Sequence, residues 1–418
     1  MPSACPSAAH GRAFSAAAAS LLATLLLVSA PRASQHPRLR LAGPEIVAGG
    51  VELLRSTDAS VLDQAAPGPV SVALLRLDPM QVTLGTALAG GCAPARETVQ
   101  AIAARERAVA AVNAGFFGMR GAGAPAGLLK HRGRWIGGTF RARGAVAFLA
   151  HGDGEPVRLA FARVTVAASL VVARRWRASR VPLDHLSPDP ATRGLSFHAE
   201  PCSGRTAEPS TPPPAPGPPP PAQPAVTATW FLRPAGSAWT VVSAAAAPTD
   251  APPGAAWLVY RGPAIPPALA RVRAGDTLAV EPRIDAPAPR LWRDAPDAVG
   301  GAGMLVSGGR AVTDWTPERT LDSFRTDRHP RTVVGVDGEG RVHLIAVDGR
   351  NPAVSVGMSF PELQRLCLAL GLRDALNLDG GGSTTLVVNG QVVNHPSDLT
   401  GSRPVSDAIV VRLRGGGP

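Results

Sequence analysis

The alternation of apolar and polar positions predicts a chain built mainly from β-strands, with a small number of helices. From residue 68 onward, short runs rich in valine, leucine and isoleucine are separated by turn-forming residues, which is typical of strands. Two other segments space their apolar residues as one face of a helix does. The expected fold class is therefore α+β, with mixed β-sheets and a few packed helices. Strands are expected at 70–77, 108–112, 144–149, 227–232, 239–243, 255–260, 332–337, 342–348, 375–378, 386–393 and 405–413, and helices at 97–107 and 359–370.

Clear boundary signals surround the second helix and two hairpins. Ser359 is followed three positions later by Glu362, which is the pattern of a capping box, and Gly371 follows the last apolar position. The pair Asn389-Gly390 divides the run at 386–393 and predicts a tight hairpin turn. Arg132-Gly133 predicts a similar turn. The elements of the C-terminal third are therefore the best defined.

The first residues have the pattern of an export signal. Arg12 precedes an alanine-rich apolar stretch at 13–30, and small residues follow it. A membrane span prefers roughly 20 strongly apolar residues, and this stretch is shorter. We therefore expect a signal peptide at 1–33, a secreted or periplasmic protein, and no stable membrane span in the mature chain.

The remaining residues are expected to form one large domain with an insertion. Residues 34–67 have no clear pattern and predict an irregular lead-in to a domain at 68–413. The composition changes between about 170 and 300, and residues 207–224 contain two proline runs that no compact core can use. Because strands are expected on both sides of these runs, we interpret 170–300 as a β-rich and proline-rich insertion.

The charge of the chain adds little to this picture. The formal net charge is +11, and nearly all of it comes from arginine, since Lys130 is the only lysine. Such a charge suits nucleic acid, a membrane surface or anionic substrates. Alanine, glycine and proline are abundant as well, so GC-rich coding is a simpler origin. Aromatic residues make up only 4% and no dense basic run contains them. We therefore do not expect nucleic-acid binding.

The cysteines leave the disulfide pairing open. Cys92, Cys202 and Cys367 follow the expected signal peptide. An exported protein could pair two of them, and the odd number leaves one thiol free. Cys367 occupies an apolar helix position, so we expect it to be the free one.

The strongest candidate for chemistry is the loop that follows the strand at 375–378. It begins with Asp379, continues with three glycines and ends with Ser383-Thr384-Thr385. Three consecutive glycines are costly for stability, but they let bare N–H groups form a concave site for an anion. No lysine follows the glycines and no helix is expected there, so this is not a nucleotide P-loop.

Several motifs in order along the chain resemble the phosphodiester glycosidase family, the uncovering-enzyme domain family. The resemblance covers roughly 68–413 apart from the insertion, and it implies an exported hydrolase that cleaves a sugar-1-phosphodiester or a related glycosidic bond. The implied partners are a glycosyl phosphodiester or a cell-surface polysaccharide, because bacterial members are often described as exopolysaccharide-related. The motifs are 111–117, Arg331-Thr332, Val347-Asp348-Gly349-Arg350, 377–384, Asn389-Gly390, 394–398 and 403–408.

The chemistry of such a bond suggests a role for each motif residue. It requires a cradle for the phosphate, a carboxylate near the anomeric carbon and hydrogen bonds to the sugar hydroxyls. Asp379 is the expected nucleophile or base, with Asp348 or Asp407 as its partner, and the separation of the pair would decide between retention and inversion. The guanidinium group of arginine can bind two phosphate oxygens at once, so arginines are expected to hold the phosphate. The expected substrate-binding residues are Asn113, Gly115, Arg331, Asn377, Gly380, Gly381, Gly382, Ser383, Thr384 and Arg403.

Each assignment has an alternative. Asp348 and Asp407 also suit ordinary turns, and an arginine-rich chain has many arginines that are merely exposed. The histidines lack the spacing of a zinc site, whereas Ca²⁺ could bind through Asp379 or its neighbours, so no cofactor is firmly predicted. A non-catalytic carbohydrate-binding or exopolysaccharide-assembly protein of the same fold is the second functional hypothesis.

Overall fold

Strands dominate the computed structural model, in which 49% of the residues are strand and 13% are helix. The α+β prediction is confirmed in this mostly-β form. The structure describes residues 41–56, 68–119, 121–149, 154–174, 177–188, 192–202, 226–245, 252 and 254–415. The expected signal peptide and the proline runs lie outside these residues. No helix in the described part is both long and apolar enough to cross a bilayer.

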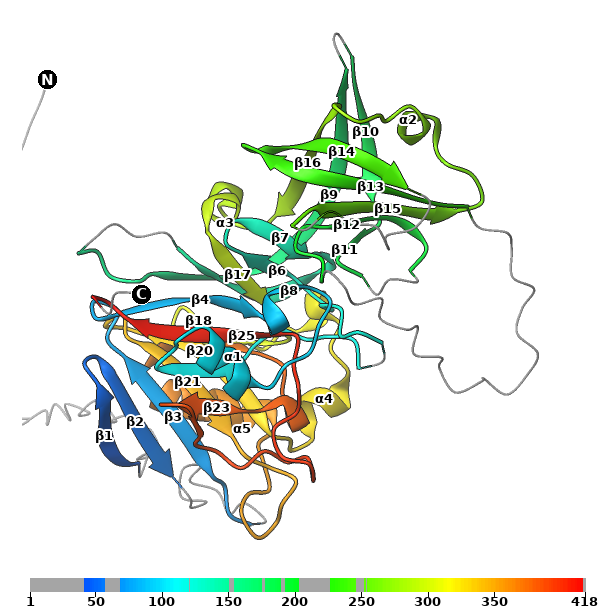
Figure 1. The fold of residues 1–418 in the computed structure, drawn as a ribbon. Helices are drawn as coiled ribbons and strands as arrows, with labels where there is room; N and C mark the ends of the chain where they lie inside the picture. Colours follow the sequence, from blue (N-terminus) through cyan, green and yellow to red (C-terminus); the bar gives the residue numbers. More distant parts are fainter. Residues whose placement is uncertain are drawn as a thin grey trace, which may run out of the picture. The chain divides into compact units, whose positions relative to one another are not determined.

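An eight-stranded sheet carries the strand that leads to Asp379 (Figure 1). Its strand order is β1-β2-β3-β21-β20-β22-β18-β19, and all neighbours pair antiparallel. The hairpin predicted around 338–340 is confirmed. The strands are β1 (Ala42–Ala48), β2 (Val51–Ser56), β3 (Val72–Leu77), β18 (Met304–Ser307), β19 (Arg310–Ala311), β20 (Arg331–Asp337), β21 (Val342–Val347) and β22 (Leu372–Asn377).

The lead-in expected to be irregular contains two of these strands, so that prediction is wrong for residues 42–56. The pattern misleads because β1 forms the edge of the sheet and its first five residues are exposed, so no apolar stripe appears. Strand β2 is buried at Val51 and Leu53 and pairs with β3 in register over its whole length.

Helix α5 (Phe360–Ala369) packs on this sheet with the face that its sequence predicts. Leu363, Leu366 and Cys367 are fully buried in one apolar cluster with residues of β20, β21 and β22. The predicted capping box between Ser359 and Glu362 is present. A box of this kind stabilises the start of a helix by satisfying two backbone N–H groups. The helix therefore fixes the strand that follows it.

A five-stranded sheet brings the two ends of the domain together. Its order is β24-β23-β5-β25-β4, and helix α1 (Val99–Arg105) contributes Val99, Ile102 and Ala103 to its apolar cluster, as predicted. The hairpin at Asn389-Gly390 joins β23 to β24 and is confirmed. The strands are β4 (Val82–Leu88), β5 (Ala110–Asn113), β23 (Leu386–Val388), β24 (Gln391–Val392) and β25 (Asp407–Leu413).

The third sheet has twelve strands and contains most of the expected insertion. Strands β9 and β16 pair along nine residues each, and they join the strands at 226–262 to those at 129–148. The β-rich segment therefore continues a sheet of the domain. The order is β11-β12-β15-β13-β14-β16-β9-β8-β17-β6-β7, with β10 beside β9. The strands are β6 (Leu129–His131), β7 (Arg134–Gly137), β8 (Thr139–Phe148), β9 (Leu159–Arg174), β10 (Arg177–Leu183), β11 (His185–Leu186), β12 (Gly194–His198), β13 (Val226–Ala235), β14 (Ala238–Ala245), β15 (Ala256–Gly262), β16 (Thr277–Asp285) and β17 (Asp297–Gly300).

Three short helices complete the described elements: α2 (Pro267–Ala270), α3 (Pro289–Asp294) and α4 (Asp322–Thr326). Between α3 and α4, Glu318 is fully buried. Its carboxylate accepts hydrogen bonds from the amides of Gly144 at 3.1 Å and Gly303 at 2.7 Å and from Arg163 Nε at 3.0 Å. One buried carboxylate therefore connects β8, β9 and the start of β18.

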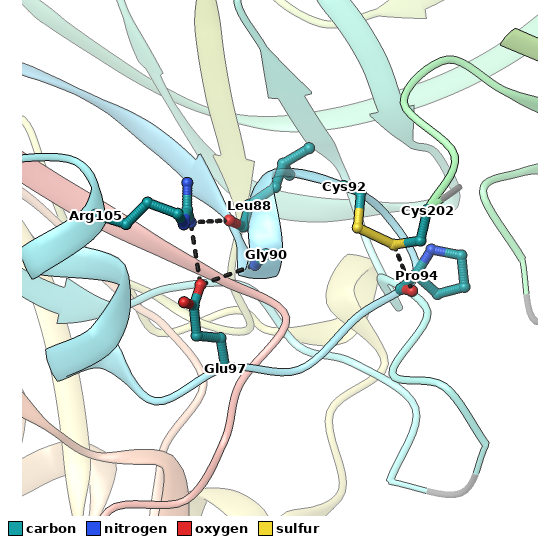
Figure 2. The surroundings of a disulfide bond; sticks show 7 residues. All are labelled: Leu88, Gly90, Cys92, Pro94, Glu97, Arg105 and Cys202. Carbon is teal, nitrogen blue, oxygen red and sulfur yellow. Dashed lines mark hydrogen bonds and ion pairs between the residues drawn. A yellow bond between two sulfur atoms is a disulfide. The ribbon is translucent and has the colours of Figure 1, made fainter. Parts of the chain in front are cut away.

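A disulfide joins the twelve-stranded sheet to the loop after β4. Figure 2 shows Cys92 bonded to Cys202, with Cα atoms 5.0 Å apart and 110 positions between them in sequence. Cys202 follows β12, and Cys92 follows the short turn Ala89–Gly91. The Gly90 amide in this turn donates a hydrogen bond to the Glu97 carboxylate at 2.8 Å. Cys367 is free and buried, as expected, and burial raises the pKa of its thiol to about 12.

Candidate functional site

The loop after β22 lies where the eight-stranded and five-stranded sheets meet. The Asp379 amide donates to the Ala114 carbonyl at 2.9 Å, and Asn113 Nδ2 donates to the Asp379 carbonyl at 2.6 Å. Asn113 ends β5, so these two bonds attach the end of one sheet to the end of the other. The Asp379 side chain is thereby held at the junction.

The Asp379 carboxyl is partly buried and has an unusual acidity. Burial raises its pKa to about 6, and the nearby Asp407 carboxylate acts in the same direction. A hydrogen bond from the Gly380 amide at 2.9 Å and the positive charge of Arg403 oppose this rise. A carboxyl group that changes its charge near pH 6 beside a second carboxyl is typical of catalytic sites.

Asp407 begins β25 and is 1% exposed. Its Oδ1 accepts a hydrogen bond from the Gly115 amide at 2.7 Å, and its Oδ2 accepts one from the Ser406 hydroxyl. Burial raises the pKa of Asp407 as well. A Cβ at position 115 would lie 3.0 Å from Oδ1, so glycine is needed there for the close approach. Gly115, which the sequence predicts to bind substrate, thus holds the Asp407 carboxylate.

The glycine loop does not form the expected row of free amides. The Gly380 amide donates to Asp379 Oδ1 and the Gly381 amide donates to the Pro330 carbonyl at 2.9 Å, so the prediction of an anion cradle is wrong for these two groups. Gly381 has a φ of +62°, which other residues adopt only with strain. The three glycines instead allow protein groups to pack closely against the loop.

Arg403 is the clearest example of this close packing. Its guanidinium forms a two-bond ion pair with Asp398, at 2.7 Å and 2.9 Å. A Cβ at Gly382 would lie 2.1 Å from both Arg403 Nη2 and Asp398 Oδ1. Arg403 therefore rests on the glycine loop within reach of the Asp379 charge, as predicted for a residue of the site. Its partner Asp398 ends the 394–398 motif but was not among the expected site residues.

A second guanidinium beside the loop belongs to Arg350, which sequence reasoning did not place in the site. Its Nη2 lies 3.0 Å from where a Cβ of Gly381 would be. Arg350 is exposed, its backbone has a φ of +63°, and among the described residues it has neither an ion pair nor a hydrogen bond from its side chain. Burial together with the charges of Arg331 and Arg350 lowers the pKa of His329. The sequence feature that could have pointed to Arg350 was the position of Arg350 directly after Asp348-Gly349.

Arg331, in contrast, is part of the interior. It is 1% exposed, and its guanidinium donates to the carbonyls of Met358, Phe324 and Asp327 at 2.8–2.9 Å. The rings of Phe324 and Phe360 lie on it, with centroids 5.1 and 4.9 Å away. The expected contact with a phosphate does not fit this environment, because the cation is already bonded and covered.

Asp348 likewise lies in a network of its own. Its carboxylate accepts hydrogen bonds from the Ser71 hydroxyl at 2.8 Å, from Asn394 Nδ2 at 2.9 Å and from the His395 amide at 2.8 Å. It is 2% exposed. These donors occupy the carboxylate and attach the 394–395 segment to β21. Of the two expected partner carboxylates, the structure therefore brings Asp407 to Asp379 and gives Asp348 a structural environment.

The remaining predicted residues form the buried support of the loop. Asn113 Oδ1 accepts from the Thr332 hydroxyl at 2.8 Å and from the Thr385 amide at 3.1 Å. Thr384 Oγ1 accepts from Thr332 at 3.3 Å. Asn377 Nδ2 donates to two carbonyls. Two buried oxygens of this support, Asn377 Oδ1 and Thr385 Oγ1, have no hydrogen-bond partner among the described residues. They are polar groups that a bound ligand or water can satisfy.

We expect the Asp379 carboxyl to lower stability at neutral pH. Its pKa is about 6 in the folded protein and about 4 when unfolded, so the folded protein binds the proton more tightly. Its contribution to stability is fully present below pH 4 and is lost as the pH rises to 6, by at most about 1–3 kcal/mol. In urea unfolding, Asp379→Asn should be more stable than the parent at pH 7.5 and lose this advantage at pH 4. An advantage that is the same at both pH values would contradict the raised pKa.

No group of three or more histidine, cysteine, aspartate or glutamate side chains in the described part is placed to hold a metal ion. The Ca²⁺ site considered from the sequence therefore stays a hypothesis without a ligand set.

Comparisons with known proteins support the resemblance read from the motifs. Residues 263–412 match the phosphodiester glycosidase family. The N-acetylglucosamine-1-phosphodiester alpha-N-acetylglucosaminidase of Bos taurus is 41% identical over 68 residues, 16% of this chain and 12% of the bovine protein. The protein YomE of Bacillus subtilis strain 168 is 38% identical over 84 residues, 20% of this chain and 13% of YomE. The matched stretches thus span about an eighth of these relatives.

Two solved structures share the fold. BPSS2145 of Burkholderia pseudomallei K96243 has a TM-score of 0.64 at 25% identity, covering 84% of this chain and 76% of that protein. A hypothetical protein from Synechocystis has the same TM-score at 23% identity, covering 88% and 63%. The family match includes the glycine loop, Arg403 and both carboxylates with a raised pKa. Over residues 263–412, this chain is therefore similar to the phosphodiester glycosidase family.

Proposed function

We propose that the protein is a hydrolase that cleaves a sugar-1-phosphodiester bond at Asp379. The observation that carries the proposal is the pairing of two carboxyls of raised pKa, Asp379 and Asp407, beside a loop flanked by two guanidiniums. A glycosidase needs a carboxylate at the anomeric carbon, and a diester adds the need for cations at the phosphate. The family match points to the same reaction.

Each side chain of the site has its own role in the proposed reaction. Asp379, ionised above pH 6, acts as nucleophile or as base for water. Asp407 is held by Gly115 and Ser406. Burial of Asp379 is the main cause of its raised pKa and the Asp407 carboxylate adds to it, which makes Asp379 a stronger base when ionised. Arg350 takes the phosphate oxygens, and Arg403, whose Nε and Nη2 are bound to Asp398, adds positive charge beside the loop. The unpartnered oxygens of Asn377 and Thr385 are available to order a bound water or sugar hydroxyl.

We place this reaction outside the cytoplasm. The pattern at 1–33 predicts export, and the Cys92–Cys202 disulfide suits an oxidising compartment. Export is also proposed for BPSS2145. A cell-surface polysaccharide carrying glycosyl phosphodiesters is accordingly the substrate class that we favour.

The test is release of free sugar from a panel of sugar-1-phosphodiesters, including UDP-sugars. We expect turnover by the purified protein and none by Asp379→Asn. If neither protein turns over any member of the panel, yet both bind the sugars equally, the protein is a binding protein and the proposal is wrong.

Replacement of Arg350 should weaken substrate binding. Because this exposed guanidinium has no partner among the described residues, we expect Arg350→Ala to raise KM about 10- to 100-fold, the value of a lost charge-assisted hydrogen bond. The folded state should be unaffected. Arg310→Ala is the matched control, since Arg310 is an exposed arginine on the edge strand β19. Equal KM values for both variants in a steady-state assay would exclude Arg350 from the phosphate site.

A further inference from the structure

A cavity of about 470 Å³ lies apart from Asp379, against the twelve-stranded sheet. Strands β8 and β9 form one wall, the end of β10 and strand β11 form another, and Gly118 with residues 124–126 closes a third. Its volume is in the range of roughly 300–1,000 Å³ that small-ligand sites occupy. The cavity is therefore large enough for one or two sugar rings, and the expected insertion supplies much of it.

Two guanidiniums and one carboxylate are among the lining residues of the cavity, so this lining carries a net positive charge. Arg141 and Arg143 line it, and in the described part neither side chain has an ion pair or a hydrogen bond. Asp184 is the one carboxylate among the lining residues. Its Oδ2 accepts a hydrogen bond from the Leu195 amide at 2.7 Å, so that oxygen is bonded to the backbone of β12. Two unpaired guanidiniums in a concave surface attract anions and can bind two oxygens each.

The rest of the lining favours a saccharide as the carrier of that anion. The floor consists of small apolar groups, including Val166, Ala168 and Leu186, and hydroxyl and imidazole groups come from Thr139 and His185. No phenylalanine, tyrosine or tryptophan lines the cavity among the described residues, so the stacking platform that single-stranded nucleic acids need is missing there. An aliphatic floor, a polar rim and two neighbouring guanidiniums suit a sugar ring that bears an acidic group.

A smaller cavity extends from this one toward the Asp379 site. It shares Ala126, Thr139 and Arg143 with the larger cavity, and it reaches Phe116 and Gly301. Phe116 follows Gly115, which holds Asp407. Gly301 packs against Asn377, because a Cβ at 301 would lie 2.2 Å from the Asn377 carbonyl oxygen. The two sites thus lie on a continuous series of residues.

We propose that this cavity binds an acidic saccharide through Arg141 and Arg143, the acidic group being a carboxylate or a phosphate. Binding here does not depend on hydrolysis at Asp379.

Calorimetric titration with three oligosaccharides tests the site. The probes are trigalacturonate for the carboxylate, a glycerol-phosphate oligomer glycosylated with glucose for the phosphate, and maltotriose as the neutral reference. We expect one acidic probe to bind at least tenfold more tightly than maltotriose, and the stronger of the two identifies the acidic group. Equal affinity for all three probes would overturn the proposal.

Matched variants locate the binding. Arg141→Ala/Arg143→Ala should lower the affinity for the acidic probe at least tenfold. Arg233→Ala/Arg283→Ala removes the same charge from exposed positions on β13 and β16, and it should change this affinity less than twofold. Equal losses in both double variants would show a general charge effect and overturn the proposal. Arg141→Ala alone, at an exposed position, should weaken binding about threefold without changing the unfolding midpoint. Asp379→Asn should bind the probe like the parent, which separates failure of this site from failure of the proposed reaction.

Discussion

Asp379→Asn should lower kcat on a sugar-1-phosphodiester by about 10³-fold, in the middle of the ~10²–10⁴-fold that a positioned acid or base contributes. The amide keeps the shape of the carboxyl and its contact with the Gly380 amide, but it cannot attack carbon or accept a proton from water. Because the pKa of Asp379 is about 6, kcat/KM of the parent should rise up to pH 6 and level off above it. Initial rates of sugar release between pH 4.5 and 8 measure both effects.

The control for this substitution lies on β22, the strand that leads to Asp379. Asp374→Asn changes a partly exposed carboxylate of β22 whose bond to the Gly308 amide is far along the strand from the loop, and it should keep near-parent kcat. A rate that falls above pH 6 would mean that Asp379 works as an acid, and a rate that is unchanged in Asp379→Asn would remove it from the mechanism.

The second large effect concerns the disulfide. Cys92→Ser/Cys202→Ser opens a covalent loop of 110 positions, and the chain-entropy model gives about 5 kcal/mol for a loop of this size, although disulfides often deliver less. We therefore expect the free energy of unfolding to fall by about 3–4 kcal/mol in guanidinium titrations. Since Cys202 follows β12, which pairs with β11, the variant should also bind the acidic saccharide less tightly.

Dithiothreitol provides the control for the double variant. It should destabilise the parent to a similar degree and leave the double variant unchanged, because the remaining thiol, Cys367, is already free. A parent protein whose midpoint does not respond to the reductant after verified reduction would contradict a structural role for this bond.

Local patterns predicted the elements around the loop because they act over a few residues. The capping box at Ser359, the apolar face of α5 and the hairpin turn at Asn389-Gly390 are each encoded within about ten positions, and the structure confirms all three. Asp379 stood out for the same reason, since three glycines next to an acid are visible without any knowledge of the fold.

The environments of the charged residues could not be predicted in this way. Arg331 and Arg350 look alike in the sequence, yet one is covered by two phenylalanine rings and the other is exposed beside Gly381. Asp348 and Asp407 both end or begin strands, and only the packing of distant segments decides which one lies near Asp379. No sequence pattern pointed to the buried position of Glu318, because the groups that donate hydrogen bonds to its carboxylate come from other parts of the chain.

The position of β25 in the five-stranded sheet has a consequence for synthesis. This strand lies between β4 and β5, two of the early strands of the domain, and its first residue is Asp407. During translation, β4 and β5 must wait for almost the whole domain to leave the ribosome before their shared neighbour arrives. A product that stops before residue 407 would lack the second carboxylate. The proposed pair of carboxylates is therefore completed only when β25 has been made.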